Sequence, residues 1–474
     1  MRRVEENNVT DTIWPENVTF KGDSTAEPKY IVLVQSLRAA VRSGELAAGV
    51  RLPPVRELSW RLGVTPGTVA RAYRMATDEG LLAAQVGRGT FVAGGGDPQP
   101  VVETSLLQPA EPDSLDFRAC RVPDVGQGAV IARALARLAA TGNYIDYPTV
   151  ATDRPARLAV RDWIGQGRAG RLSEDEIVLT FGAQNAVMTV LQACLTGPAP
   201  VILTEDLTYP GARHAARLLR ATLIGVEMDD EGIRPDRLEE ALRRHGGQVL
   251  LTSAEVHSPT TIHTSAARRQ EIASLARRYH FQIVEDDCHC ISRPETPAYR
   301  ALCPERGWYV SSLSKCFSPS LRFGFAACPS PLARSARQVA QSTYYGLPQP
   351  MLDLAAELLA SGAVEETRRA VVAAVEARVR AAVNALGGWD IAWREDVPFL
   401  WLRLAQGWRC STFSTACEAV GIRIKPADEF ALADGAAPHA VRLALNAGIP
   451  EDRFAAGLAT LSGLLRHPPI GVEF

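Results

Sequence analysis

The sequence predicts two different folds in one chain, a small helix-turn-helix domain with a two-stranded β wing and a larger α/β domain after it. The length of 474 residues is about three times that of a typical domain. Hydrophobic residues make up 46% of the chain and charged residues 22%, which is typical of a folded globular protein rather than a disordered one. Short helical periods occupy residues 28–92, whereas strands alternate with helical stretches from residue 128 onward.

These patterns divide the chain into four regions. We predict an N-terminal extension over residues 1–27, the small domain over 28–93, a linker over 94–127 and the large domain over 128–474. The linker is predicted from the run Gly94 to Pro100, which is rich in Gly and Pro, and from the lack of sustained periodicity after it.

Composition also indicates where the protein resides and whether its cysteines are reduced. The chain has no run of 18 apolar residues and no apolar leader after Met1, so we expect a cytoplasmic protein without a membrane partner. The nine cysteines are odd in number and never spaced C-x-x-C, which predicts reduced thiols. Cys288, His289 and Cys290 could bind zinc, but no fourth ligand cluster is near in sequence, so we expect a packed strand end and no metal site.

The small domain is basic, although the whole chain has a net charge of −2. Residues 28–92 contain nine Lys or Arg and four acidic residues. This asymmetry favours a polyanionic partner such as double-stranded DNA, the alternative being a solvated basic surface.

Three helices and a wing are expected in this domain. Apolar residues at helical spacing predict a first helix over 30–43, and a second helix over 55–62 ends at Gly63. Thr65 and Pro66 are the expected N-cap and first residue of a third helix. On this helix Val69, Tyr73 and Ala76 share a packing face and Arg71 and Arg74 lie on another, while residues 81–85 and 90–92 flank a glycine turn.

The motifs L-P-x-x-R-x-L at 52–58, T-V-x-x-A-Y at 68–73 and G-x-G-T-F-V at 87–92 resemble the GntR-type winged helix. In that family the corresponding positions approach DNA, which implies contacts from Arg56, Thr65, Thr68 and Gly87. Pro66 and Ala70 replace basic residues that many members carry. We therefore expect Arg71, Arg74 and Arg88 to supply the remaining contacts, mainly to phosphates.

In the large domain, short apolar strands alternate with helical stretches, which predicts a parallel α/β sheet. The expected strands are residues 178–180, 200–203, 248–252, 281–284 and 308–310.

A serine-rich loop after the last of these strands contains Lys315, one of only four lysines in the chain. A desolvated lysine amine can lose its proton and form a Schiff base with an aldehyde, which a guanidinium cannot do. Ser312, Ser314 and Arg322 in the same loop offer donors for a phosphate. An aldehyde that carries a phosphate is pyridoxal 5′-phosphate, and we predict this cofactor.

The pattern S-x-S-K-x-x-x-P-x-x-R-x-G, which starts at Ser312, resembles that of fold-type I aminotransferases. By this resemblance Tyr209 would stack on the cofactor ring, Asp286 would pair with its protonated nitrogen, and Arg442 would bind a substrate or effector carboxylate. Gly182, Ala183 and Gln184 open a helix whose N-terminus would hold the phosphate. Together with the N-terminal domain, these motifs are similar to those of MocR-type regulators.

Some positions depart from the aminotransferase pattern. Ser258 stands where aminotransferases have Asn, Cys288 where they have Tyr, and Thr152 where they have Gly. In aminotransferases, that Asn and that Tyr normally contact the phenolic oxygen of the cofactor. We therefore expect cofactor and amine binding to survive while efficient transamination is lost.

Three functions remain open on the sequence alone. The first is a transcriptional regulator that senses an amine, an amino acid or pyridoxal phosphate itself and transmits the change to DNA. The second is a working aminotransferase with a vestigial winged helix, and the third is a regulator that uses the large domain only to dimerise. The resemblance to fold-type I proteins implies a homodimer.

Overall fold

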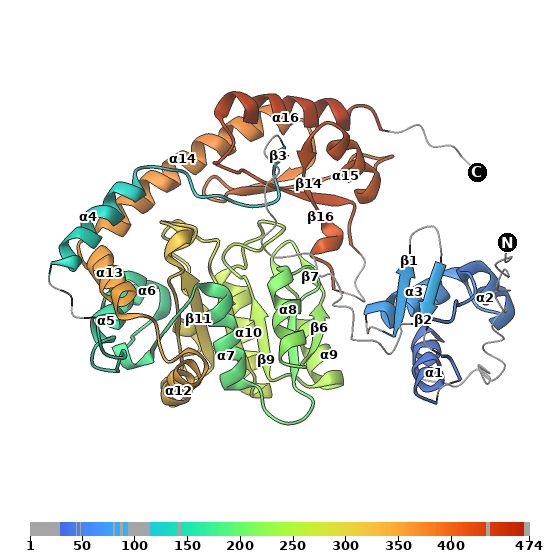
Figure 1. The fold of residues 1–474 in the computed structure, drawn as a ribbon, viewed down its shortest axis with the longest axis horizontal. Helices are drawn as coiled ribbons and strands as arrows, with labels where there is room; N and C mark the ends of the chain where they lie inside the picture. Colours follow the sequence, from blue (N-terminus) through green and yellow to red (C-terminus); the bar gives the residue numbers. More distant parts are fainter. Residues whose placement is uncertain are drawn as a thin grey trace, which may run out of the picture. The chain divides into compact units, whose positions relative to one another are not determined.

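The computed structural model describes residues 29–43, 45–47, 49–78, 81–85, 89–92, 114–140, 142, 144–432 and 437–468. The chain forms two compact units, Met1–Gln108 and Pro109–Phe474 (Figure 1). Within the described residues, no helix combines the length and apolar character needed to cross a membrane.

The first unit contains the three helices and the wing that the sequence predicts. These are α1 (Lys29–Ser43), α2 (Val55–Leu62), α3 (Pro66–Asp78), β1 (Leu82–Gln85) and β2 (Gly89–Val92). The two strands are antiparallel, with Leu82 opposite Val92. The face of α3 expected to pack is buried, and it joins a core formed by Leu33, Leu37, Leu58, Val69, Tyr73, Ala76, Leu82 and Val92.

The turn between α2 and α3 depends on one glycine. Gly63 ends α2 in the left-handed conformation with φ +63°, which other residues adopt at a cost. The Tyr73 hydroxyl donates to the Pro53 carbonyl oxygen at 2.9 Å and so ties α3 to the segment before α2.

A seven-stranded sheet forms the centre of the second unit. Its strand order is β4 (Ile177–Thr180), β12 (Gly324–Ala327), β11 (Gly307–Ser312), β10 (Gln282–Asp286), β9 (Val249–Thr252), β5 (Val201–Glu205) and β6 (Thr222–Val226). The five strands predicted from the sequence, which are β4, β5, β9, β10 and β11, run parallel to one another. The sequence did not predict β12, which is antiparallel to both β11 and β4. Only residues 313–323 connect β11 to β12, which is too short for the helical crossover that a parallel neighbour needs.

Helices cover both faces of this sheet, as Figure 1 shows. On one face α7 (Ala183–Cys194), α8 (Pro210–Leu218) and α12 (Ala333–Tyr344) pack on strand residues such as Val284 and Val310. On the other, α9 (Pro235–His245) and α10 (Ala266–Tyr279) pack on Leu250 and Ile283. Adjacent residues of one strand therefore enter different cores, as the alternation of a β-strand requires.

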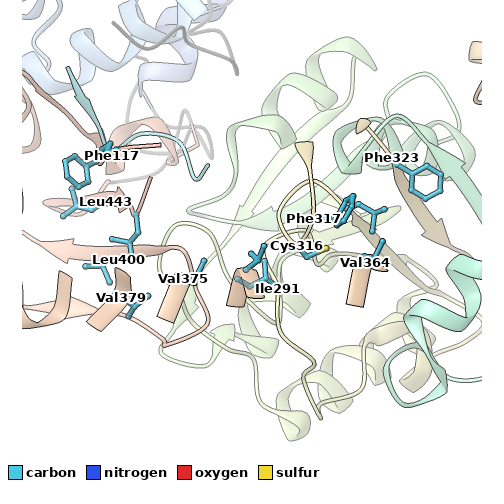
Figure 2. Close-up of a cluster of buried hydrophobic side chains, with 14 of the residues drawn as sticks. Phe117, Ile291, Cys316, Phe317, Phe323, Val364, Val375, Val379, Leu400 and Leu443 are labelled. Atoms are coloured by element: carbon cyan, nitrogen blue, oxygen red, sulfur yellow. The ribbon is translucent and has the colours of Figure 1, made fainter. Parts of the chain in front are cut away.

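A second, antiparallel sheet has the order β13 (Ile391–Ala392), β14 (Phe399–Arg403), β17 (Ala440–Ala444) and β16 (Lys425–Pro426). Figure 2 shows Leu400 and Leu443 from this sheet beside Phe117 and Val379, and Cys316 and Phe317 in another part of the same cluster. One continuous core thus joins the second sheet to the loop that carries Lys315.

The remaining helices and strands complete the second unit. They are β3 (Leu115–Asp116), α4 (Gln127–Ala139), α5 (Arg154–Ile164), α6 (Gln166–Ala169), β7 (Met228–Asp229), β8 (Gly232–Ile233), α11 (Tyr299–Leu302), α13 (Gln349–Ala360), α14 (Ala363–Leu386), α15 (Cys410–Ala419), β15 (Ile422–Arg423) and α16 (Glu451–Leu465). Four short 3-10 helices cover Glu174–Glu176, Pro319–Leu321, Ser330–Leu332 and Ala427–Glu429.

The region that we expected to be linker differs from the structure at its C-terminal end. Residues 115–116 form β3, which pairs with β15 in parallel, and Phe117 is fully buried in the core of the large unit. A strand of two residues is too short to show the alternation of apolar and polar residues by which a strand is recognised in a sequence.

Candidate functional site

Lys315 lies in the turn that follows β11, at the carboxyl edge of the large sheet. Leu313 and Phe317 are fully buried on either side of it, and Leu313 N–H donates to the Phe323 carbonyl oxygen at 3.0 Å. The amine is partly exposed, and Nζ donates to the Cys120 carbonyl oxygen at 3.0 Å. The core thus holds the backbone of this turn while the amine remains within reach of a ligand.

Asp286 is the last residue of β10, and parallel pairing places it opposite Val310 of β11. Burial raises the pKa of its carboxyl group. Oδ1 accepts from the Cys288 amide at 3.1 Å, and Asp286 forms no ion pair within the described residues. A half-buried carboxylate that has no cation beside it and a raised pKa fits a ligand that brings a protonated nitrogen.

Tyr209 caps α8 and shares a small pocket with Asp286 and Gln184. Burial, with smaller contributions from Cys288 and Asp286, raises the pKa of its phenol to about 12. A Cβ atom at Gly211 would lie 2.2 Å from both Tyr209 Cε1 and Gln184 Oε1. A side chain at position 211 would therefore collide with the Tyr209 ring and with Gln184.

The N-terminus of α7 lies beside the Arg322 side chain. Gly182 precedes the helix with φ +85°, and the Arg322 guanidinium donates to the Phe181 carbonyl oxygen at 3.1 Å. A Cβ atom at Gly182 would lie 3.0 Å from Arg322 Nη2, so only glycine leaves this approach open. The first N–H groups of a helix, here those of Ala183 and Gln184, have no intrahelical acceptor and attract anions.

Ser312 and Ser314 lie beside this helix end. Ser312 pairs with Gly324 across β11 and β12, and a Cβ atom at Gly324 would lie 2.5 Å from the Gly182 backbone. Ser312 is buried and Ser314 half-buried, and the Ser314 amide donates to Ser312 Oγ at 3.4 Å. The structure therefore brings the serines, Arg322 and the helix N-terminus together.

Arg442 projects from β17 and is 6% exposed. Nη1 donates to Ser258 Oγ at 3.0 Å and Nη2 to the Arg118 carbonyl oxygen at 2.8 Å, while the buried Nε has no partner. The guanidinium carbon lies 5.3 Å from the centre of the Phe399 ring and 5.0 Å from that of Phe430. Arg442 forms no ion pair among the described residues, so a ligand carboxylate would be its first anionic partner.

Several contacts at this site have no signal in the local sequence. The acceptors for Lys315 and Arg442 are backbone carbonyl groups 195 and 324 residues away along the chain. Ser258 was noted only as a departure from a motif, but its hydroxyl group is bound to the arginine predicted to hold a carboxylate. Only the fold brings these groups together.

Cys288 and Cys290 line one cavity of about 280 Å³ together with Ser312, whereas the His289 ring packs edge-on against Phe399 with centroids 5.3 Å apart. Burial raises the pKa of the Cys288 thiol well above its ordinary value, so this thiol is neutral and is not a charged ligand. In the parts of the chain that the structure describes, no three His, Cys, Asp or Glu residues form a group that could hold a metal ion.

A buried ion network fixes the residues on either side of Asp286. Arg168 bonds Glu285 and Asp287, each at 3.0 Å, and Arg269 bonds Glu285 and Glu255, each at 2.8 Å. Burial raises the pKa of Asp287 to about 7, although Arg168 opposes that shift. With both of its neighbours held, the backbone of Asp286 has little freedom to turn its carboxylate away.

The candidate DNA-binding surface lies around the start of α3. Thr65 Oγ1 and Thr68 Oγ1 are 2.9 Å apart, and Thr65 Oγ1 accepts from the Thr68 amide at 3.3 Å. Arg56 and Arg74 are exposed, and the Arg71 guanidinium lies 4.0 Å from the centre of the Tyr30 ring of α1. Gly87 and Arg88, both predicted to contact DNA, lie outside the described residues.

Two family comparisons match this division of the chain. The aminotransferase class I and II family matches residues 122–461, and the gntR family of bacterial regulatory proteins matches residues 29–92. Both lie within the units that the fold shows.

Individual relatives include HTH-type transcriptional regulators, and solved structures of similar fold include aminotransferases. The chain is 25% identical to the uncharacterized HTH-type transcriptional regulator YdeF of Bacillus subtilis (strain 168) over 94% of its own length and 96% of that protein. It is 29% identical to the vitamin B6 salvage pathway transcriptional repressor PtsJ of Salmonella typhimurium (strain LT2) over 63% and 67%. A crystal structure of a multiple substrate aminotransferase from Thermococcus profundus covers 75% of this chain and 92% of its own with a TM-score of 0.67 and 23% identity, which shows the fold alone.

Over its large unit the chain therefore belongs to the aminotransferase class I and II family and, with a gntR-family domain in front of it, to the MocR-type regulators.

Proposed function

We propose that this protein regulates transcription by binding double-stranded DNA with its first unit and by sensing an amine or amino acid at a pyridoxal phosphate site in its second. One observation carries the proposal: Arg442, buried and without an anionic partner in the described residues, lies in the same site as Lys315 in a chain that also has a gntR-family domain. A sensor needs a charged group without a partner of opposite charge, to which a ligand can bind. A ligand can shift the equilibrium between two conformations of a protein only if it binds one of them more tightly than the other.

The residues of the site fit pyridoxal phosphate. Arg322, Ser312, Ser314 and the N-terminus of α7 would hold the phosphate, and the carboxylate of Asp286 would pair with the ring nitrogen. Tyr209 would lie against the ring, because Tyr209 lines one pocket with Asp286, the residue that would hold the ring nitrogen. When bound, the cofactor supplies an aldehyde that condenses with primary amines and a ring that withdraws electrons from them.

The other residues favour recognition over turnover. Arg442 positions a carboxylate through its fork, and Lys315 presents a primary amine at the sheet edge. Ser258 is already bound to Arg442, and the neutral Cys288 thiol is a weak donor, so neither replaces the Asn and Tyr of aminotransferases. We infer that a bound amine persists here longer than in an enzyme, as a sensor requires.

The names of two relatives support a ligand that is connected with vitamin B6. PtsJ is named as a vitamin B6 salvage pathway repressor, and a protein 27% identical over 319 residues is named as the pyridoxine biosynthesis regulator PdxR of Corynebacterium glutamicum. Pyridoxal phosphate itself is therefore included among the proposed effectors of this chain.

For DNA, the capped start of α3 would enter the major groove. Thr65 and Thr68 would approach the bases or phosphates, and Arg56, Arg71 and Arg74 would contact the backbone. Gly87 and Arg88 remain predictions from the sequence.

A homodimer is part of the proposal. Ile145, Tyr147 and Tyr345 are 87%, 80% and 73% exposed, and the rings of Tyr147 and Tyr345 lie 6.2 Å apart. An exposed apolar patch of this kind is typical of a surface that another protein covers. A two-fold dimer would read two half-sites on the DNA.

Borohydride reduction tests the proposed chemistry. The full-length protein is incubated with pyridoxal phosphate, reduced and digested, and we expect mass spectrometry to find the cofactor attached to Lys315. The Lys315→Ala variant should carry no covalent label, while both proteins retain a DNA duplex selected from a random pool. Labelling without any DNA retention favours an aminotransferase, and DNA retention without labelling favours the cofactor-independent regulator.

A further inference from the structure

The segment from Ser114 to Arg121 is the part of the large unit that follows the link to the winged helix. Its first half is tied to β15, because Leu115 and Phe117 amides donate to the Gly421 and Arg423 carbonyl oxygens at 2.9 and 2.8 Å. Asn446 Nδ2 donates to the Asp116 carbonyl oxygen at 2.8 Å. Phe117 is fully buried beside Leu443 (Figure 2).

The second half of the segment has quite different partners. The Arg118 carbonyl oxygen accepts from Arg442 Nη2 at 2.8 Å, and the Cys120 carbonyl oxygen accepts from Lys315 Nζ at 3.0 Å. These donors come from β17 of the second sheet and from the loop after β11 of the first. Two residues of this short segment, Arg118 and Cys120, therefore hold both side chains that the proposed cofactor and effector would use.

A ligand competes with both hydrogen bonds. A lysine amine engaged by an aldehyde has fewer hydrogens to donate, and a carboxylate is a stronger acceptor for a guanidinium than a backbone carbonyl oxygen. A ligand-filled site therefore weakens the attachment of residues 118–120, while β3 keeps residues 115–117 in place.

We propose that the Ser114–Arg121 segment reports the state of Lys315 and Arg442 to the DNA-binding unit, because its carbonyl groups hold both cations and the chain continues from it to that unit. This inference rests on the proposed function and names the part of the chain that would transmit it. It predicts that ligand binding and DNA binding are coupled in both directions.

Hydrogen exchange of the full-length protein tests the first step. The Arg118 amide is the probe, since it donates to Asp116 Oδ1 at 2.9 Å. The Phe117 amide, which donates to the Arg423 carbonyl oxygen at 2.8 Å in the half that stays in place, is the internal reference. We expect pyridoxal phosphate to speed the exchange of the Arg118 amide about tenfold, the effect of losing one hydrogen bond. Lys315→Ala should exchange at the faster rate without any cofactor.

Asn446→Ala tests the second step without touching Lys315 or Arg442. It releases the Asp116 carbonyl oxygen, whereas the control Ser462→Ala removes the acceptor of Trp389 Nε1 at 3.2 Å, away from the segment. With a duplex selected from a random pool, we expect pyridoxal phosphate to change the Kd about tenfold in the wild-type and Ser462→Ala proteins. In Asn446→Ala the change should be less than twofold although the cofactor still binds.

The outcomes separate the two proposals. If the wild-type protein binds both cofactor and DNA but exchange of the segment is unchanged by cofactor and by Lys315→Ala, the inference is wrong and the proposed function stands. A full response in Asn446→Ala also overturns the inference. If the wild-type protein takes up no cofactor, the proposed function is lost and the inference with it.

Discussion

At the scale of single residues, the site is defined by charges that the protein itself leaves uncompensated. Arg442 is sandwiched between Phe399 and Phe430 and has a buried Nε without a partner. Asp286 is a half-buried carboxylate that forms no ion pair among the described residues. Unpaired buried charges reduce stability, so their presence in one site favours a ligand with the opposite charges.

Arg442→Ala should abolish recognition of a carboxylate and spare recognition of an amine. With the cofactor-loaded protein, we expect the visible spectrum to respond to L-alanine at a concentration about 100-fold higher than in the wild type, because a buried charged pair is lost. The response to ethylamine, which has no carboxylate, should be unchanged. Arg403→Ala is the control, since Arg403 lies on the neighbouring strand but pairs with Asp390 at the surface at 3.0 Å. Equal weakening for both ligands would show that Arg442 does not bind the carboxylate.

Asp286→Asn should have opposite effects without and with the cofactor. Burial raises the pKa of the Asp286 carboxyl group in the folded protein, so the folded protein favours the protonated form. The free energy of unfolding therefore falls as the pH rises from the carboxyl pKa in the unfolded chain through the higher pKa in the folded protein. Without cofactor, the neutral amide of the Asp286→Asn variant should therefore increase the Tm at pH 7, with no gain at a pH below the ordinary carboxyl pKa of 3.8. With pyridoxal phosphate the wild type should be stabilised more than the variant. Thermal unfolding across pH checks both signs, and a lower Tm for the cofactor-free variant at pH 7 would contradict the assignment.

At the scale of elements, the site depends on how closely α7 approaches β12. A Cβ atom at Gly324 would lie 2.5 Å from the backbone of Gly182, at the N-terminus of α7. The contact is between two backbones, so a flexible side chain cannot relieve it. The helix end and Arg322 meet only because glycine stands at both positions.

Gly324→Ala should push these elements apart. We expect a loss of about 1–3 kcal/mol in the free energy of unfolding, typical of overpacking, and a weaker affinity for pyridoxal phosphate. Urea unfolding and a cofactor titration measure the two effects. Gly388→Ala is the control, because a Cβ atom there would have no neighbour within 4 Å. A Gly324→Ala protein with wild-type stability would show that the two backbones can separate freely.

Elements with strong local signals were predicted well. The three helices of the first unit begin within one residue of their predicted starts, and Gly63, Thr65 and Pro66 mark the end of α2 and the start of α3. The direction of β12 and the presence of the second sheet were not predicted. Both depend on pairing between distant segments, which the local pattern of apolar residues does not specify.

At the scale of the whole molecule, the apolar patch of Ile145, Tyr147 and Tyr345 is the surface that a second copy would cover. Ile145→Asp should turn the dimer into monomers at micromolar concentration, because it places a charge in an apolar interface. Light scattering measures the mass. Leu218→Asp is the matched control, since Leu218 is 73% exposed and lies on α8, outside the patch. A monomeric wild type, or a dimer that survives in Ile145→Asp, would contradict this assignment.

The sequence by itself determined the two fold classes, their order in the chain and the residue types of the candidate site. These follow from local signals: helix caps, apolar periodicity, and the rare Lys315 among serines. Only the tertiary structure decided which groups hold Lys315 and Arg442. Their acceptors are the carbonyl groups of Cys120 and Arg118, and every residue has such a group. The folding of distant segments into one core selects which of them lies within hydrogen-bond distance, and no pattern of side chains along the chain records that choice.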